Sequence, residues 1–273
     1  MVILLACFTV IQYNGRMKRI LFSLLPVVLF LVQPVAPAVT LWSDGVNEQG
    51  GWYDFNKSRD GSDSELCWAL TASNLIAWWQ DRRKEQVPQG VPTGAAVWRT
   101  FREAFNNDGS DPDEAVSWWF TGKYAPHQSP TGETNARILR PDAGAYYERD
   151  FSAELMYRNR APRVTAADIA RAFAEGFSRG DAFWIGVSFL KPNGQRYTHA
   201  LTVWGVDCSQ SATGEIRLDA LYMADSDDRM HMLHRIPLRV VDGLLLFDCG
   251  KHPIYGRIGD ITVNNYTGFR VHP

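Results

Sequence analysis

Hydrophobic and small residues recur at helical spacing in the first half of the chain. After the polar residues 62–64, this spacing predicts a helix over about 66–84. It predicts two shorter helices, one over about 95–105 and one that starts near 111. Residues 123–164 are rich in proline, glycine and arginine and show little periodicity, so a long loop or an insertion is expected there.

The second half of the chain changes to the pattern of strands after one more helix. Thr165 and Asp168 are the expected capping pair of that helix, and Gly180 is its expected stop. Alternating and β-branched runs then predict strands over Ala182–Phe189, Thr198–Val206, Arg217–Met223 and Leu244–Phe247. Helices followed by antiparallel strands indicate an α+β fold.

The N-terminal residues have the pattern of an export signal. A basic start is followed by the apolar run 20–32 and the small-residue site Ala36-Pro37-Ala38. The pattern predicts a signal peptide over 1–38, with Met17 as a candidate for the true start, and one domain over 39–273. The protein is therefore expected to be secreted or periplasmic, without a membrane anchor once the signal is removed.

Composition narrows the class of protein further. The chain is 45% hydrophobic and has ten tryptophans, so a sizeable core is available. A net charge of −2 without a basic stripe argues against a nucleic-acid partner. Removal of the signal leaves Cys67, Cys208 and Cys249, an odd number, so at least one thiol is free. Cys208 and Cys249 either form a disulfide or are two unpaired buried cysteines.

Cys67 is the first candidate for chemistry. It falls in the first turn of the predicted helix, where free backbone N–H groups and the helix dipole favour a thiolate. The alternative is a buried cysteine that acts only as a small hydrophobic residue. A thiolate that serves as a nucleophile needs a base as its partner.

The strands supply that partner. If the strands on either side of residues 208–215 form a hairpin centred near Ala212, His199 lies across from Asp225. A carboxylate there orients the histidine and favours its charged form. Asp227 and Asp228 compete with Asp225 for this role. A cysteine at a helix start and a histidine held by an aspartate on a later sheet are the layout of a papain-like active site.

A metal site is the competing interpretation of the histidines. His231 and His234 have a metal-like spacing, but the glutamate of an HExxH motif is missing. A tetrahedral zinc site would need at least a third protein ligand. We therefore expect neither a metal nor another cofactor.

Four segments, "GWYDFNKS", "LCWALTASNLIAWW", "THALTVWGVD" and "LYMADSDD", resemble the Mac/IdeS-type immunoglobulin-degrading cysteine endopeptidases in content and order. The resemblance implies a papain-like α+β fold, with the nucleophile at the start of a buried N-terminal helix packed on an antiparallel sheet. It implies a secreted endopeptidase with a protein substrate such as immunoglobulin. Nothing in the sequence indicates the oligomeric state.

The resemblance also assigns roles to individual residues. Cys67 would be the nucleophile, His199 the general base and Asp225 the carboxylate that orients the histidine. Asp227 matches a second carboxylate near the histidine, and Lys57 matches a lysine of the oxyanion hole. Two alternatives stay open: a papain-like amidase or acyltransferase with the same triad, and a secreted binding protein whose triad is inactive.

Overall fold

The structure is a computed structural model that describes residues 38–125, 136–158, 164–190, 193–211, 213–250 and 260–272. The predicted signal peptide and its cleavage site lie almost entirely outside the described residues and stay a prediction. Within the described residues, no helix has both the length and the apolar character needed to cross a membrane. All that follows concerns the unit over residues 35–273.

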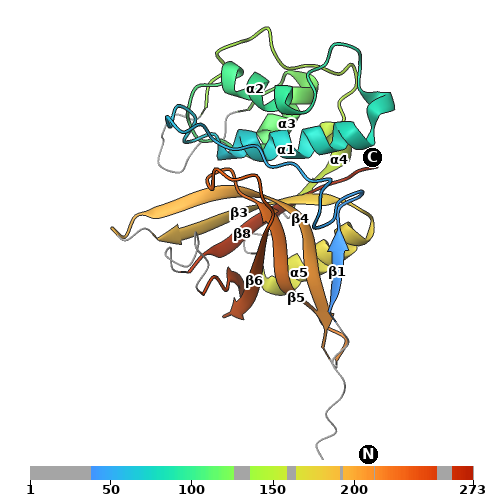
Figure 1. The fold of residues 1–273 in the computed structure, drawn as a ribbon, viewed down its shortest axis with the longest axis vertical. Helices are drawn as coiled ribbons and strands as arrows, with labels where there is room; N and C mark the ends of the chain where they lie inside the picture. Colours follow the sequence, from blue (N-terminus) through green and yellow to red (C-terminus); the bar gives the residue numbers. More distant parts are fainter. Residues whose placement is uncertain are drawn as a thin grey trace, which may run out of the picture. The chain divides into compact units, whose positions relative to one another are not determined.

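Helices from the first half of the chain gather on one side of this unit (Figure 1). The central helix α1 is buried along almost its whole length, which explains why its sequence is apolar or small on every side. Gln80 and Asn74 are buried on α1, and both have hydrogen-bond partners. The helices are α1 (Cys67–Arg82), the short 3-10 helix η1 (Lys84–Gln86), α2 (Ala95–Ala104), α3 (Pro112–Thr121), α4 (Ser152–Leu155) and α5 (Ala166–Ser178).

The strands form one antiparallel sheet that closes on itself. Each of the strands β4, β3, β8, β7, β6 and β5 pairs with the next, and β4 also pairs with β5, which completes a barrel of six strands. Strand β1 extends the edge of β4, and β2 pairs with β8. The strands are β1 (Val39–Trp42), β2 (Met156–Arg158), β3 (Ala182–Leu190), β4 (Arg196–Gln210), β5 (Ile216–Ala224), β6 (His234–Val241), β7 (Leu244–Phe247) and β8 (Thr262–Phe269).

The predicted fold class is therefore wrong. A papain-like α+β fold, with a buried N-terminal helix packed on an antiparallel sheet, was expected, but the strands form a closed barrel of six strands. The long strand β4 makes closure possible, because its ladder with β5 has irregularities between Val203 and Gly205 and between Asp207 and Cys208. Bulges of this kind bend a strand and increase its twist. Gly205 is needed at the first bend, since a Cβ there would lie 2.4 Å from the Trp42 ring.

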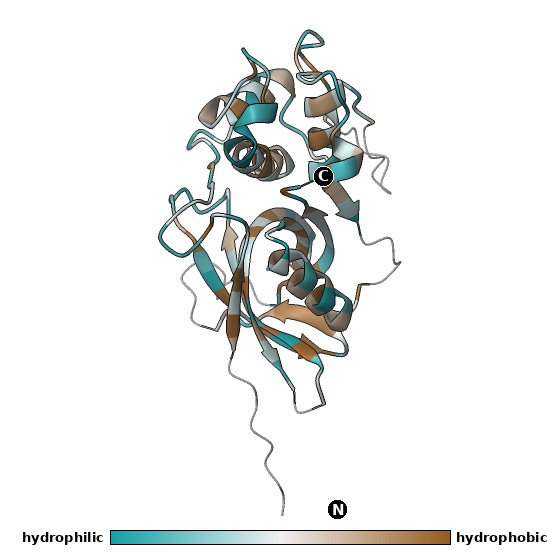
Figure 2. Cartoon of the chain, turned by 90° about the vertical axis from the view of Figure 1, so that its right-hand side faces the viewer, coloured by the Kyte–Doolittle hydropathy of each residue, from teal (hydrophilic) through white to brown (hydrophobic). Residues whose placement is uncertain are grey.

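Two hydrophobic cores lie on opposite faces of β3 and β4. Trp184 and Trp204 belong to the core that they share with α1, α2 and α3. Phe183 and Leu201 belong to the core inside the barrel, where α5 packs with Phe173. Hydrophobic segments, in brown, recur along the strands around α5 (Figure 2). Because both faces are buried, these strands read as nearly continuous apolar runs.

The individual elements were predicted better than the fold. Helices were expected near the positions of α1, α2, α3 and α5, and Thr165 and Asp168 do form a capping box. The predicted loop over 123–164 is wrong in part, because α4 and β2 lie within it. Strands β1, β6 and β8 were not predicted. Cys208 and Cys249 are free thiols, so the disulfide alternative is not the one found.

Candidate active site

Cys67 is the first residue of α1, as the sequence predicts. None of the polar residues 62–64 caps α1 with its side chain. Asp63 is fully buried and instead accepts hydrogen bonds from the backbone N–H and the hydroxyl of Ser58. The polar turn therefore stabilises the loop that leads into α1. The first backbone N–H groups of a helix lack partners within it, and Cys67 lies in that first turn.

Asn74 fixes α1 relative to the barrel. Its side-chain NH₂ donates to the hydroxyl of Thr202 on β4 at 3.1 Å. Its carbonyl oxygen accepts from the backbone N–H of Phe55 at 3.0 Å. One buried amide thus joins three segments: the helix with Cys67, the strand with His199 and the loop with Lys57.

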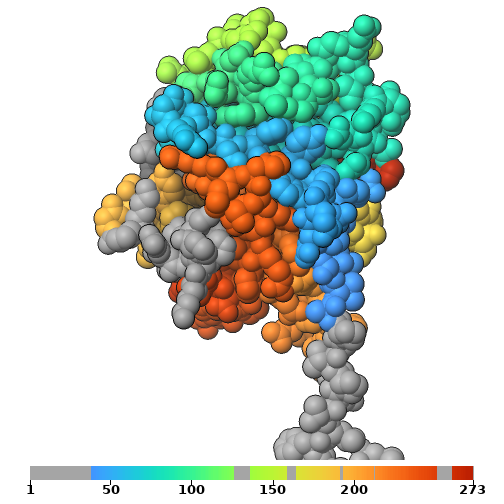
Figure 3. All heavy atoms as spheres, in the orientation of Figure 1, coloured from blue at the N-terminus to red at the C-terminus, as the bar shows by residue number. Residues whose placement is uncertain are grey.

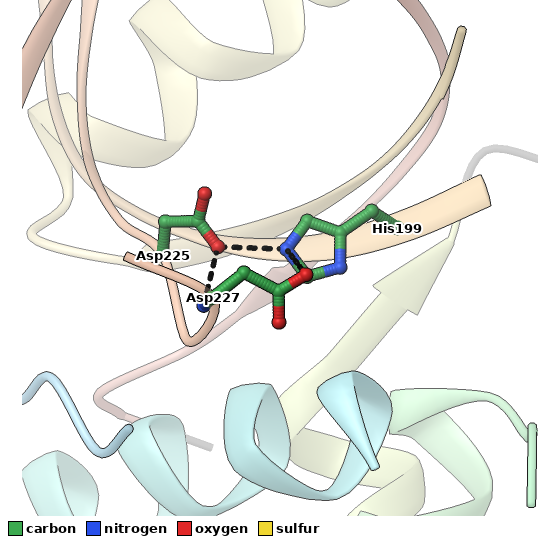
Figure 4. Close-up of side chains that lie close together, drawn as sticks. All are labelled: His199, Asp225 and Asp227. Carbon is green, nitrogen blue, oxygen red and sulfur yellow. Dashed lines mark hydrogen bonds and ion pairs between the residues drawn. The ribbon is translucent and has the colours of Figure 1, made fainter. Parts of the chain in front are cut away.

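His199 and Asp225 meet as predicted, although the predicted register is wrong. Nε2 of His199 lies 2.7 Å from Oδ1 of Asp225, and both side chains are buried (Figure 4). Strand β4 pairs with β5 through Thr202 and Ala224, so continuing the ladder would place Asp225 opposite Leu201. Asp225 therefore reaches the histidine diagonally from the end of β5.

The thiol of Cys67 completes this arrangement by a hydrogen bond with His199. Since Asp225 occupies Nε2, the ring nitrogen left for the thiol is Nδ1. Burial acts to raise the pKa of the Cys67 thiol, but the hydrogen bond and charge of His199, with the charge of Lys57, lower it below its usual value. Burial likewise acts to lower the pKa of His199, but Asp225 and Cys67 raise it well above its usual value. The site favours a thiolate–imidazolium pair.

Lys57 lies beside this pair. Its ammonium donates to the backbone carbonyl of Ser64 at 2.5 Å and pairs with Asp227 at 2.6 Å. Burial acts to lower the pKa of Lys57, but the charges of Cys67 and Asp227 outweigh it and raise the pKa. The side chain is only 12% exposed. The sequence around Lys57 would ordinarily indicate a surface lysine in bulk solvent. In the structure, Lys57 is instead mostly buried.

Asp227 belongs to the same turn as Asp225, but its side chain is exposed where that of Asp225 is buried. Its carboxylate is 44% exposed and lies 3.9 Å from Nε2 of His199. Its backbone N–H donates to Oδ1 of Asp225 at 2.9 Å. The backbone carbonyl of Ser226 accepts from Lys57 N–H, which attaches this turn to the loop before α1. Figure 3 shows the two segments in contact, in orange and blue.

A cleft of about 250 Å³ opens beside the cysteine and the histidine. Its walls come from the helical side and from the barrel, so a bound chain would contact both. The lining residues are Cys67, Ser110, Asp111, Pro112, Trp184, Gly186, Thr198, His199, Ala200 and Asn265. The thiol–imidazole pair therefore has access to a ligand-sized space.

A second histidine–aspartate pair lies close to the first. Nε2 of His234, at the start of β6, is hydrogen-bonded to Asp228, and the Asp228 side chain is fully buried. His231 points elsewhere, toward the backbone carbonyl of Asp54, and packs against the Trp52 ring. The metal-like spacing of His231 and His234 does not bring them together in a site.

Only one set of three residues among those described has ligand atoms close enough for a metal ion: His199, Asp225 and Asp227, within 4.8 Å of one another. Ligands of a tetrahedral zinc ion with bonds of about 2.0 Å lie about 3.3 Å apart. The Nε2–Oδ1 distance of 2.7 Å between His199 and Asp225 is that of a hydrogen bond. The geometry fits a hydrogen-bonded dyad better than a metal centre.

Residues 42–103 match the family model Mac 1. This region is about a quarter of the chain and contains Lys57, Cys67, α1 and nearly all of α2. No curated protein matches the chain. The match corrects the wider resemblance drawn from the sequence. What is similar is a Mac 1 region that ends at residue 103, and not the Mac/IdeS-type immunoglobulin-degrading endopeptidase family as a whole.

The match gives no support to the barrel half of the site. His199, Asp225 and Asp227 all lie beyond residue 103, so their proposed roles depend on geometry alone. Sequence reasoning also missed two neighbouring carboxylates, Asp54 and Asp111. Asp54 stands in a loop and Asp111 before a proline, and neither context distinguishes a functional residue from a turn former.

Proposed function

We propose that the protein is a cysteine peptidase in which Cys67 is the nucleophile, His199 the proton carrier and Asp225 the residue that orients the histidine. The observation that supports this most is the continuous chain of contacts from the Cys67 thiol through the His199 ring to the buried Asp225. It lies on a cleft, and it shifts both pKa values toward the ion pair that such an enzyme needs.

The proposed reaction starts with attack of the Cys67 thiolate on the carbonyl carbon of a peptide bond. The C–N bond breaks as His199, from Nδ1, donates its proton to the leaving amine, and a thioester with Cys67 remains. Neutral His199 then takes a proton from water, whose oxygen attacks the thioester. The C–S bond then breaks and the carboxylic acid leaves. The released thiolate and the protonated His199 form the thiolate–imidazolium pair again. Asp225 accepts the hydrogen bond of Nε2–H throughout and stays ionised.

Charge on the carbonyl oxygen needs stabilising in both halves of this reaction. Cys67 N–H, in the first turn of α1, and the Lys57 ammonium are the donors that we propose for it. Asp227 holds the Lys57 ammonium by an ion pair, and Ser64 O accepts a hydrogen bond from it. We assign Asp227 to positioning Lys57, with a weaker electrostatic effect on His199 at 3.9 Å.

The test is cleavage of a proteome-derived peptide library and of intact proteins, immunoglobulin included, read by mass spectrometry. Wild-type protein is expected to cut peptide bonds, and Cys67→Ala is expected to cut none. Cys208→Ser is the matched control, since Cys208 is at the far end of β4, where burial raises its pKa to about 12. Equal cleavage by Cys67→Ala and wild type would refute the proposal.

Two further assays separate the two alternatives. Turnover of small amides or acyl donors without any cut peptide would indicate an amidase or acyltransferase. A Cys67 thiol that iodoacetamide does not label near neutral pH would indicate an inactive binding protein. Action outside the cell is part of the proposal and depends on the predicted export signal.

A further inference from the structure

The cleft beside Cys67 combines apolar walls with one carboxylate. Trp184, Pro112 and Ala200 are buried and form apolar parts of its wall. Asp111 is half-buried and is the acidic residue of the lining. Gly186 contributes no side chain, and the Asn265 side chain lies over it. A hydrocarbon stem that ends in a positive charge matches this combination of surfaces.

The charge of Asp111 is not neutralised by an ion pair within the described part of the chain. Its Oδ1 accepts from the backbone N–H of Asp113 at 2.8 Å, as the N-cap of α3. Its neighbours in the first turn do have a cation: Arg158 pairs with Asp113 and lies 3.9 Å from Glu114. The carboxylate without a cationic partner is thus the one that lines the cleft.

The N-terminus of α3 has few free backbone N–H groups that could give the cleft a positive charge. Pro112, at the first helical position, has no N–H, and the N–H of Asp113 is already bonded to Asp111. Asp113 and Glu114 add two acidic residues to the first turn. Burial, and then the charges of Glu114, Asp108 and Asp111, raise the pKa of nearby Tyr124. This wall thus has three acidic residues, Asp111, Asp113 and Glu114, and one arginine, Arg158, which lies against the last two.

We propose that this cleft is a specificity pocket for a lysine or arginine side chain next to the scissile bond, with Asp111 as the residue that selects it. This inference depends on the proposed peptidase function. The aliphatic stem of the substrate side chain packs on Trp184 and Pro112, and its cation binds the free edge of the Asp111 carboxylate. Asp111 acts on substrate choice and has no part in the proton transfers.

The test compares two sets of peptidyl chloromethyl ketones that alkylate a reactive thiol. One set carries lysine and the other norleucine, which has a similar stem without the charge, at each of the two positions before the reactive carbon. Rates with wild type, Asp111→Asn and Asp108→Asn are each divided by that enzyme's own rate with iodoacetamide. Asparagine is as good an N-cap as aspartate, so Asp111→Asn keeps the start of α3. Asp108→Asn removes a nearby charge outside the cleft.

Wild type and Asp108→Asn are expected to prefer lysine at one position by about tenfold or more, as for a hydrogen bond to a charged group. Asp111→Asn is expected to lose most of that preference. No preference in wild type, or an equal loss in Asp108→Asn, would overturn the pocket assignment. Failure of iodoacetamide to label Cys67 in wild type is a different result, because it would overturn the peptidase proposal itself.

Discussion

Two histidine–aspartate pairs lie within one short stretch of this protein, and only one of them has the surroundings of a catalytic group. His199–Asp225 and His234–Asp228 are both buried and both hydrogen-bonded through Nε2. The first faces the Cys67 thiol and lines a cleft. The second closes the turn after β5 onto the start of β6. A buried histidine–aspartate pair is therefore not by itself evidence of catalysis, and a reactive partner in an accessible space is what distinguishes one pair.

Asp54 connects the two pairs electrostatically. It is buried, its Oδ2 accepts from the Met232 N–H, and its Oδ1 has no partner within the described residues. Burial raises the pKa of Asp54 to about 7, and the charges of Asp228 and Asp225 contribute to the rise. The turn with Asp225 and Asp228 thus lies near a third carboxyl group, Asp54, which stays protonated to a higher pH than an ordinary aspartate.

Replacing each histidine separately is the strongest way to break the comparison. His199→Ala is expected to lower kcat by more than about 10⁴-fold, because the nucleophile loses its base. His234→Ala is expected to lower the free energy of unfolding by about 1–3 kcal/mol, because Asp228 loses its buried partner. Activity per folded molecule, with unfolding followed by circular dichroism, checks both. Near-complete loss of activity in well-folded His234→Ala would contradict the purely structural role assigned to His234.

The two carboxylates near His199 give the next largest contrast. Asp225→Asn is expected to reduce kcat by up to about 10⁴-fold, because an amide disfavours the required tautomer and charge of the histidine. Asp227→Ala is expected to cost less, since that carboxylate is partly exposed and 3.9 Å from the ring. Steady-state kinetics on one peptide substrate measure both. A larger loss for Asp227→Ala would show that the orienting residue has been misassigned.

The sequence predicts those parts of the site that depend on residues close together in the chain, and it fails for those that depend on distant residues. The start of α1 at Cys67 and the capping box of α5 depend on neighbouring residues, and the pattern predicts both. The pairing of His199 with Asp225 was predicted from a simple hairpin centred near residue 212. The real ladder pairs Gln210 with Ile216, so the hairpin is centred one residue later and the register differs by two residues. Barrel closure depends on the bulges of β4 and on strand β8 from the end of the chain, which no local pattern reveals.

Lys57 gives a further contrast, because its ammonium lies in the turn region of the first pair, in an ion pair with Asp227. Lys57→Met keeps most of the stem and removes the ammonium, so kcat is expected to fall by about a hundred- to a thousandfold with KM nearly unchanged. Arg59, two residues along the same loop, is exposed, and Arg59→Met is the matched control. Initial rates over a range of substrate concentrations separate kcat from KM. A Lys57→Met turnover within about threefold of wild type would contradict an oxyanion role.

Asp54 is expected to have the smallest effect, and it acts on stability. Its pKa is about 7 in the folded protein against 3.8 for the free side chain, so the folded state binds the extra proton between these values. Its contribution to the free energy of unfolding is fully present below about pH 4 and is lost as the pH rises through about 7. Asp54→Asn should flatten this decline in urea unfolding. The same decline in both proteins would refute the assignment.

The most direct test of the central claim is the pH dependence of Cys67 alkylation by iodoacetamide, read by peptide mass spectrometry. Paired with His199, Cys67 is expected to react rapidly at pH values well below the ordinary thiol pKa of about 8.5. Cys208 and Cys249, whose pKa values burial raises to about 12 and about 11, should stay unlabelled there. His199→Ala should move the Cys67 profile to higher pH, and His234→Ala should not. A wild-type Cys67 profile centred at or above the ordinary thiol value, unchanged by His199→Ala, would contradict the account.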